Sequence, residues 1–103
     1  MISIAHFDSA EPDFAERAEL ALSTLAARPG YLRGSLARST DDDHWVLVTE
    51  WENVGAYRRA LGAFEVKLHA APLLGEAIDV PSAFEPVLSI RDGVAETFRT
   101  DRA

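Results

Sequence analysis

The apolar segments of this 103-residue chain follow one another in the order strand, helix, strand, strand, helix, strand. That order predicts an α+β fold of the ferredoxin-like βαββαβ type with an antiparallel sheet. Residues 44–51 alternate as a strand must, and residues 12–27 and 54–71 carry apolar side chains at helical spacing. Both faces of the 44–51 strand are largely apolar, so we expect helices on one side of the sheet and a second copy of the chain on the other.

The first half of the chain is expected to form a strand, a helix and a second strand. Residues 2–7 form the first strand, in which Ile2, Ile4 and His6 share one face. The helix is expected over residues 12–27, because a proline suits its first turn and the pair Pro29-Gly30 ends it. Its apolar stripe consists of Phe14, Ala18, Ala21, Leu22 and Leu25. Residues 31–40 form the second strand, and three aspartates at 41–43 form a solvated turn into the third.

The second half continues with a divided helix and a fourth strand. Asn53 is a suitable cap for the helix, Gly62 divides it into two pieces, and Pro72 ends the second piece. One apolar stripe, which we expect to face the sheet, consists of Tyr57, Leu61, Phe64 and Leu68. Residues 82–90 form the fourth strand, where Pro86 indicates an edge or a bulge because it has no N–H donor. We expect one domain over residues 1–91 and a charged tail, open to disorder, over residues 92–103.

Composition excludes several classes of protein. The net charge is −7, with 17 acidic and 10 basic residues, and the arginines are scattered, which argues against a nucleic-acid-binding protein. There is no cysteine, which fits a reducing cytoplasm, and no apolar run approaches the roughly 20 residues of a membrane span. No glycine-rich loop indicates a nucleotide cofactor, and histidines 6, 44 and 69 lack metal-ligand spacing, so we expect neither cofactor nor metal.

Four segments carry a resemblance to a known family: Arg28–Tyr31, Thr49–Asn53, Ala56–Leu61 and Phe64–His69. Through them, residues 1–90 resemble the antibiotic biosynthesis monooxygenase superfamily of dimeric α+β barrels. The resemblance implies a homodimer whose fourth strands extend the partner's sheet, and a pocket between sheet and helices in each subunit. The superfamily includes cofactor-independent oxygenases of phenolic polyketides, quinol oxygenases, haem-degrading enzymes and members without an assigned activity, so the fold alone does not define a reaction.

The candidate catalytic residues are His6, Tyr57 and His69, and the candidate substrate-binding residues are Trp51, Leu61, Phe64 and Leu68. Cofactor-independent oxygenation needs a base, a donor that stabilises the enolate, and a site that excludes water. His6 suits the base, and Tyr57 suits the donor. His6 and Trp51 have a structural reading as well, since a lone histidine on an apolar face is often a hydrogen-bonded core residue and Trp51 can serve core or dimer packing.

Two functions from different classes stay open. One is a cofactor-independent monooxygenase acting on an aromatic, polyketide-like or quinol molecule, and the other is a non-catalytic dimeric ligand-binding or accessory domain. A polar pocket with a base in reach favours the first, and a pocket filled by tryptophan, phenylalanine and leucine favours the second. Haem degradation is a third reading: His69 stands where haem-degrading relatives place their iron ligand, but Phe7 and Ala60 stand near the places of their asparagine and tryptophan.

Overall fold

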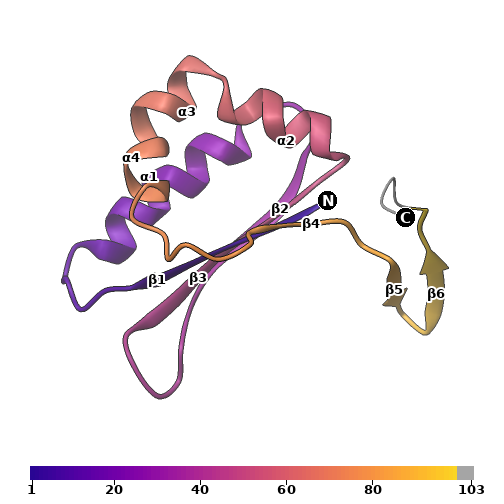
Figure 1. Cartoon of the computed structure of the whole chain (residues 1–103), viewed down its shortest axis with the longest axis horizontal. Coiled ribbons are helices and arrows are strands. Elements are labelled where there is room, and N and C mark those ends of the chain that lie inside the picture. Colours follow the sequence, from indigo (N-terminus) through magenta and orange to yellow (C-terminus); the bar gives the residue numbers. More distant parts are fainter. Residues whose placement is uncertain (100–103) are drawn as a thin grey trace.

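The computed structural model describes residues 1–99 and contains an antiparallel sheet with the strand order β2-β3-β1-β4. This order and the sequence of elements confirm the ferredoxin-like α+β prediction. Figure 1 shows the helices gathered above the sheet and a C-terminal hairpin to one side. The elements are β1 (Ile2–Asp8), α1 (Phe14–Ala26), β2 (Tyr31–Arg38), β3 (His44–Trp51), α2 (Val54–Leu61), α3 (Phe64–His69), α4 (Ala71–Leu74), β4 (Ala83–Phe84), β5 (Leu88–Arg91) and β6 (Val94–Thr97).

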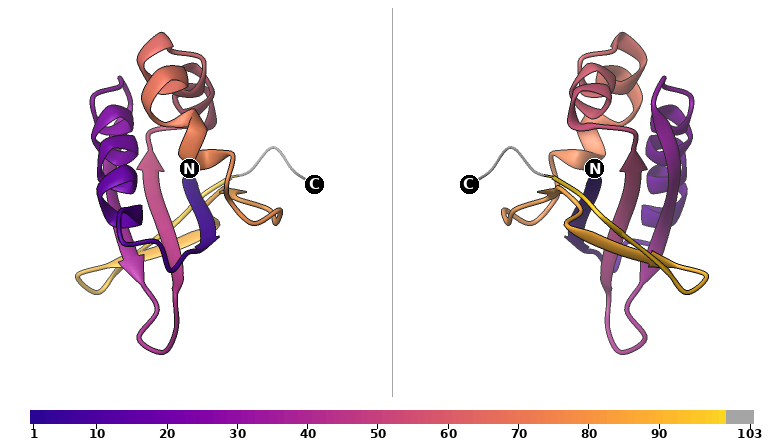
Figure 2. Two further views of the ribbon diagram at one scale, coloured as in Figure 1. Left: turned by 90° about the vertical axis from the view of Figure 1, so that its left-hand side faces the viewer. Right: turned by 90° about the vertical axis from the view of Figure 1, so that its right-hand side faces the viewer.

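The two faces of the sheet are covered differently. In β1 the side chains of Ala5 and Phe7 are buried against the helices, and those of Ile4 and His6 alternate with them on the other face, where they are half-buried. Figure 2 shows the helices on one side of the sheet and the hairpin of β5 and β6 running across the strands on the other. We call this second side the open face. Its strand residues are Ile2, Ile4, His6, Asp8, Arg33, Ser35, Ala37, His44, Val46, Val48 and Glu50.

The hydrophobic core lies between the sheet and the helices. Phe14 of α1 is 1% exposed, and its ring lies 5.3 Å from that of Phe7 and 5.2 Å from that of Trp45. Complete burial of an aromatic side chain contributes about 1.5–3 kcal/mol, so these contacts hold α1 on the sheet. The buried face of α1 consists of Phe14, Ala18, Ala21 and Leu25, as its apolar spacing predicted. The helix begins at Phe14, two residues after the expected start, and Asp13 makes no side-chain cap.

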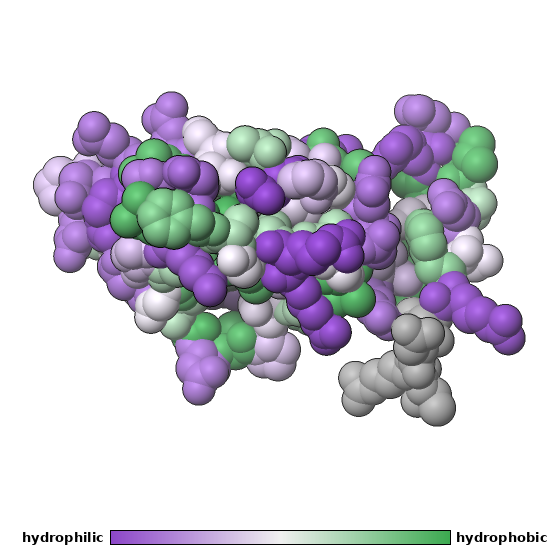
Figure 3. Space-filling view, turned by 90° about the horizontal axis from the view of Figure 1, so that it is seen from above, coloured by the Kyte–Doolittle hydropathy of each residue, from purple (hydrophilic) through white to green (hydrophobic). Residues whose placement is uncertain are grey.

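The segment after β3 folds into three short helices. The side chain of Asn53 accepts a hydrogen bond of 2.8 Å from the Ala56 N–H, as expected of a helix cap. The break after Gly62 changes the helical phase, so that α3 buries Val66, whereas Phe64 and Leu68 are 73% and 53% exposed. The expectation that these last two residues face the sheet is therefore wrong. Figure 3 looks down on the helices and shows a mainly hydrophilic surface with apolar patches.

The C-terminal segment is divided at Pro86. Strand β4, Ala83–Phe84, pairs with β1 at the edge of the sheet, and the chain then leaves the sheet to form the hairpin of β5 and β6. Asp92 and Gly93 have φ angles of 52° and 78° and make the turn. The expected tail over residues 92–103 thus contains strand β6 in its described part, and residues 100–103 lie outside the described residues. Within residues 1–99, no helix has the length and apolar character needed to cross a bilayer.

Candidate active site

Three aromatic rings meet where β3 ends beneath α2. The indole of Trp51 is 1% exposed, and its ring lies 5.5 Å from that of Tyr31 and 5.7 Å from that of Tyr57. Its N–H donates a hydrogen bond of 2.8 Å to Thr49 Oγ1, which satisfies both buried groups. We call these three rings the Trp51–Tyr57 cluster. The structure therefore brings together two of the predicted site residues, Trp51 and Tyr57, on the helix side of the sheet.

Two glycines allow the cluster to form. Gly30 has φ +86°, a backbone conformation that favours glycine. A Cβ at this position would lie 2.4 Å from the Ala56 Cβ, so only glycine allows α2 to lie this close to the turn. That approach sets Tyr57, the next residue of α2, beside Trp51. A Cβ at Gly34 would lie 2.7 Å from the Tyr31 hydroxyl and 2.9 Å from the Val48 carbonyl oxygen. Glycine at position 34 thus leaves the space that the Tyr31 ring occupies.

Hydroxyl groups surround the cluster. The buried Ser3 hydroxyl donates to the oxygen of Tyr57 at 3.4 Å, which leaves the Tyr57 O–H free to donate elsewhere. Burial raises the pKa of Tyr31, so its phenol stays neutral and also acts as a donor at neutral pH. Tyr57 is half-buried, and Leu61, one turn later, is half-buried against the core. The arrangement offers flat apolar walls and phenolic donors, which suit an aromatic molecule with an oxygen substituent.

The two predicted histidines lie elsewhere. His6 is on the open face, because Ala5 and Phe7 take the helix side of β1, so it cannot border the same space as Tyr57. His69 is exposed on α3, 3.5 Å from Glu65 one turn earlier. The three candidate catalytic residues, His6, Tyr57 and His69, are therefore not brought together in one site. Phe64 and Leu68 also point away from the cluster, since the phase change after Gly62 turns them outward.

His6 instead belongs to a chain of three polar side chains. His6 Nδ1 lies 3.0 Å from His44 Nε2, and His44 Nδ1 lies 2.8 Å from Asp8 Oδ1. The register of β1 and β3 brings them together, because Asp8 pairs with His44 and His6 pairs with Val46, two residues further along β3. Sequence reasoning did not find this chain. The sequence places Asp8 and His6 on one face of the first strand, but only the register between β1 and β3 shows that His44 lies beside them.

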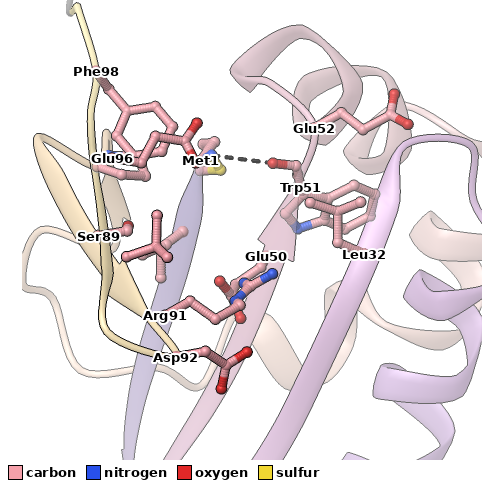
Figure 4. A pocket seen from close by; sticks show the side chains of 13 residues that line it. Met1, Leu32, Glu50, Trp51, Glu52, Ser89, Arg91, Asp92, Glu96 and Phe98 are labelled. Atoms are coloured by element: carbon pink, nitrogen blue, oxygen red, sulfur yellow. Dashed lines mark hydrogen bonds between the residues drawn. The ribbon is translucent and has the colours of Figure 1, made fainter.

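A cavity of about 480 Å³ lies at the other end of the open face, beneath the hairpin. Figure 4 shows Arg91 reaching from β5 toward Glu50 of β3, with Phe98 and Glu96 beside Met1. The Met1 ammonium donates a hydrogen bond of 3.1 Å to the Trp51 carbonyl oxygen. None of His6, Tyr57 and His69 lines this cavity. Sequence reasoning missed it, because four of its lining residues, Asp92, Val94, Glu96 and Phe98, come from the segment treated as a tail.

A metal site would need several acidic or imidazole ligands around one point. Within residues 1–99, no group of three or more histidine, aspartate or glutamate side chains has a geometry that could hold a metal ion. The Asp8–His44–His6 chain is linear, since His44 bonds Asp8 through Nδ1 and His6 through Nε2, and it does not converge on a common point.

The chain matches one protein-family model and is similar in fold to several solved structures. The family model described as "Antibiotic biosynthesis monooxygenase" matches residues 1–71. No curated protein matches the sequence. Among solved structures, SnoaB, a cofactor-independent oxygenase from Streptomyces nogalater, is similar with 22% identity and a TM-score of 0.66, over 99% of this chain and 93% of that chain.

Two further structures are similar at comparable levels. A proposed antibiotic biosynthesis monooxygenase from Deinococcus radiodurans has 18% identity and a TM-score of 0.66, over 87% of this chain and 95% of that chain. A conserved protein from Methanosarcina mazei Go1 has 16% identity and a TM-score of 0.59, over 80% of this chain and 84% of that chain. At these identities the likeness shows the fold.

Proposed function

Because the chain belongs to the antibiotic biosynthesis monooxygenase family, whose model matches residues 1–71, we propose that it is a cofactor-independent monooxygenase of a phenolic aromatic molecule such as an anthrone or a quinol. The reaction takes a proton from an activated carbon, and the resulting carbanion reduces O₂. For an anthrone, the peroxide formed at that carbon loses water. One oxygen atom becomes the new carbonyl and the other leaves as water, so the substrate itself supplies the electrons.

The observation that carries this proposal is the Tyr57 hydroxyl, which lies beside the Trp51 ring and 3.4 Å from the Ser3 hydroxyl. When Ser3 donates to the Tyr57 oxygen, the proton of Tyr57 is available for a substrate oxygen. A donor aimed at the oxygen of an enolate stabilises the charge that develops when the proton leaves. Tyr31 adds a second phenol against the Trp51 ring, and burial raises the pKa of this phenol, which keeps it neutral. In this proposal Tyr57 acts on the substrate, and Trp51 and Leu61 form the wall.

The position of His6 narrows the class of substrate. His6 lies across the sheet from Tyr57, so it does not take the substrate proton in this site. In this proposal, water takes the substrate proton. A carbon acid that loses a proton to water at a useful rate is one whose anion spreads over adjacent carbonyl and phenol groups, as in an anthrone. An unactivated aromatic ring is excluded on this ground.

A second function, a ligand-binding or accessory domain of the same fold, is favoured by a different observation. The space between sheet and helices is filled by large side chains, of which Trp51, Phe7 and Phe14 are each 1% exposed. The cavity of about 480 Å³ lies on the open face and reaches neither Tyr57 nor a histidine. A domain of this kind would bind an aromatic molecule without consuming oxygen.

Oxygen uptake with anthrone as the probe separates the two functions. Purified protein should consume one O₂ for each anthraquinone formed, and Tyr57→Phe should lower the rate. Binding of anthrone, measured by quenching of tryptophan fluorescence, without oxygen uptake above the protein-free rate would favour the ligand-binding function instead.

We also propose a homodimer formed through the open face. Ile4, Val46 and Val48 give this face an apolar centre that no helix within residues 1–99 covers. The hairpin adds Leu88 and Ile90, which are 57% and 66% exposed. Patches of this kind on a small chain are typical of an interface between copies. Light scattering over a range of dilutions should therefore give a mass twice that of the 11.3 kDa chain.

A further inference from the structure

Two buried hydroxyl groups lie opposite each other on the helix side of the sheet. They belong to Ser3 of β1 and Thr49 of β3, which pair directly in the register of the two strands. Apart from the indole N–H of Trp51, they are the polar side-chain groups among the buried residues of the range 1–99. Burial of a hydroxyl costs free energy unless a hydrogen bond compensates for it, so the partners of these two groups are informative.

Each buried hydroxyl contacts one side chain of the Trp51–Tyr57 cluster. The Trp51 indole N–H donates to Thr49 Oγ1 at 2.8 Å, and the Ser3 hydroxyl donates to the Tyr57 oxygen at 3.4 Å. Thr49 and Trp51 are two residues apart in one strand, so their side chains lie on the same face of β3. The two hydroxyls that the core buries are therefore the two that contact Trp51 and Tyr57.

Packing alone does not require either hydroxyl. Valine has about the volume of threonine and is an equally good strand residue, and alanine fills the space of serine without a polar atom. Other buried positions on the same face of β1 and β3 are apolar, namely Ala5, Phe7 and Leu47. The hydroxyls thus occur at the strand positions that contact the candidate site, which indicates a role in that site.

The hydrogen bond to Thr49 selects one orientation of the Trp51 ring. An indole has a single donor, its N–H, and a ring turned over about its attachment would move that donor away from Thr49 Oγ1. The turned ring is disfavoured, because a buried donor without an acceptor is costly. Since Thr49 uses the N–H, Trp51 offers a ligand its ring carbons alone. The donors of the cluster are then the phenols of Tyr31 and Tyr57.

We propose that Ser3 and Thr49 are positioning residues of the candidate site: Thr49 fixes the orientation of the Trp51 wall, and Ser3 fixes the direction of the Tyr57 hydroxyl. This inference rests on the function proposed above. Ser3 acts on kcat, because a donor aimed at the developing oxyanion acts in the transition state. Thr49 acts on KM, because the wall binds the aromatic body of the substrate before and during the reaction.

The indole N–H signals in an NMR spectrum test the role of Thr49 without a substrate. The chain has two tryptophans, so it gives two such signals, and Trp45→Phe assigns them. Thr49→Val removes the acceptor and should shift the Trp51 signal, whereas Thr49→Ser keeps a hydroxyl and should restore it. The Trp45 signal is the internal control and should not move, because this N–H donates to the Ser9 carbonyl oxygen at 3.1 Å.

The tyrosine signals test the role of Ser3 in the same way. Tyrosine isotopically labelled at Cζ gives two signals, since the chain has two tyrosines, and Tyr57→Phe assigns them. Ser3→Ala removes the hydroxyl and should shift the Tyr57 signal, and Ser3→Thr, which keeps a hydroxyl, should shift it less. The Tyr31 signal should stay in place in both variants.

Kinetics with anthrone show whether the positioning affects turnover. Ser3→Ala should lower kcat about two- to tenfold with little change in KM, the usual effect of one neutral hydrogen bond. In a Tyr57→Phe background the same substitution should have no further effect, because Ser3 acts through the hydroxyl that this background lacks. Thr49→Val should raise KM, and Thr49→Ser should restore it. Ser23→Ala is the matched control, since it removes an exposed hydroxyl of α1.

Each outcome has a distinct meaning. Unshifted Trp51 and Tyr57 signals in Thr49→Val and Ser3→Ala would overturn the positioning, and so would an equal loss of kcat from Ser3→Ala with and without the Tyr57 hydroxyl. Wild type without oxygen uptake would overturn the proposed function, and the NMR signals would still decide the positioning. If Thr49→Val does not fold, wild type decides: one ring orientation gives one Trp51 signal, and two signals in slow exchange would contradict the inference.

Discussion

Tyr57 of α2 and Ser3 of β1 meet through their hydroxyl groups at 3.4 Å, although 54 residues separate them in sequence. The contact joins the start of the first strand to the helix that follows the third. It is one of the few polar contacts in a space otherwise filled by aromatic and aliphatic side chains. A polar pair of this kind is stable in a core only when both groups are satisfied, or when one of them serves a ligand.

The packing of α1 on the sheet is tested by substituting one buried and one exposed phenylalanine. Phe14→Ala should destabilise the fold by about 3–5 kcal/mol, because the side chain is fully buried between Phe7 and Trp45. Phe64→Ala should change the free energy of unfolding by less than about 0.5 kcal/mol, because that ring is 73% exposed. Urea denaturation measures both. A large loss in the Phe64 variant would restore the sequence prediction that this residue faces the sheet.

The space at Gly34 is tested by adding one methyl group. Gly34→Ala should destabilise the fold by about 1–3 kcal/mol, since its Cβ would lie 2.9 Å from a backbone oxygen that cannot move freely. The matched control is Gly62→Ala, whose Cβ would meet nothing nearer than 3.5 Å, and which should be neutral or slightly stabilising. Thermal melts of the two variants measure the difference. Equal melting temperatures would contradict the placement of Tyr31 over β2.

Most of the fold could be predicted from the sequence, because the spacing of apolar residues along the chain differs between strands and helices. The alternation in residues 44–51 and the stripe of α1 led directly to the observed burial of Leu47, Trp51 and Phe14. Periodicity does not specify which face of a strand meets the helices, however. His6 was correctly grouped with Ile2 and Ile4, and that group took the open face because Phe7, on the other side, packs against Phe14.

The candidate site was predicted less well for two physical reasons. A break between two helices changes the direction in which the following side chains point. The residues from Tyr57 to Leu68 therefore have helical spacing in the sequence but do not lie on one face in the structure. Contacts between strands depend on register, and the pairing of Asp8 with His44 cannot be read from either segment alone. Pro86 indicated an edge, and it was in fact the point where the chain leaves the sheet.

Glu76 gives a pH dependence of stability. The Arg17 guanidinium donates to this carboxylate at 2.6 Å and holds the pKa of Glu76 below its usual value. A carboxyl whose pKa is lower in the folded state adds stability above its ordinary pKa of about 4.3, and that stability is lost as pH falls through the folded value. Glu76→Gln should therefore melt below wild type at pH 7. The gap should close toward about pH 3, and a gap that widens would contradict this coupling.

The hairpin should matter for association more than for folding. All residues of β5 and β6 are exposed, so removing residues 87–103 should leave the melting temperature of the separated chain nearly unchanged at low concentration. The same deletion should weaken the dimer, because Leu88 and Ile90 are lost. Light scattering on the deleted chain measures this. A large fall in the melting temperature of a monomeric sample would show that the hairpin packs on its own sheet.

The central claim is that Tyr57 stabilises the anion that reacts with oxygen. Oxygen uptake with anthrone, measured side by side for wild type, Tyr57→Phe and the exposed control Lys67→Ala, tests it most directly. Removal of a single donor to an oxyanion lowers kcat by about 100-fold in well-studied cases, so at least about a tenfold loss is expected for Tyr57→Phe. The control should match wild type. Equal rates for Tyr57→Phe and wild type, with both proteins folded, would contradict the account.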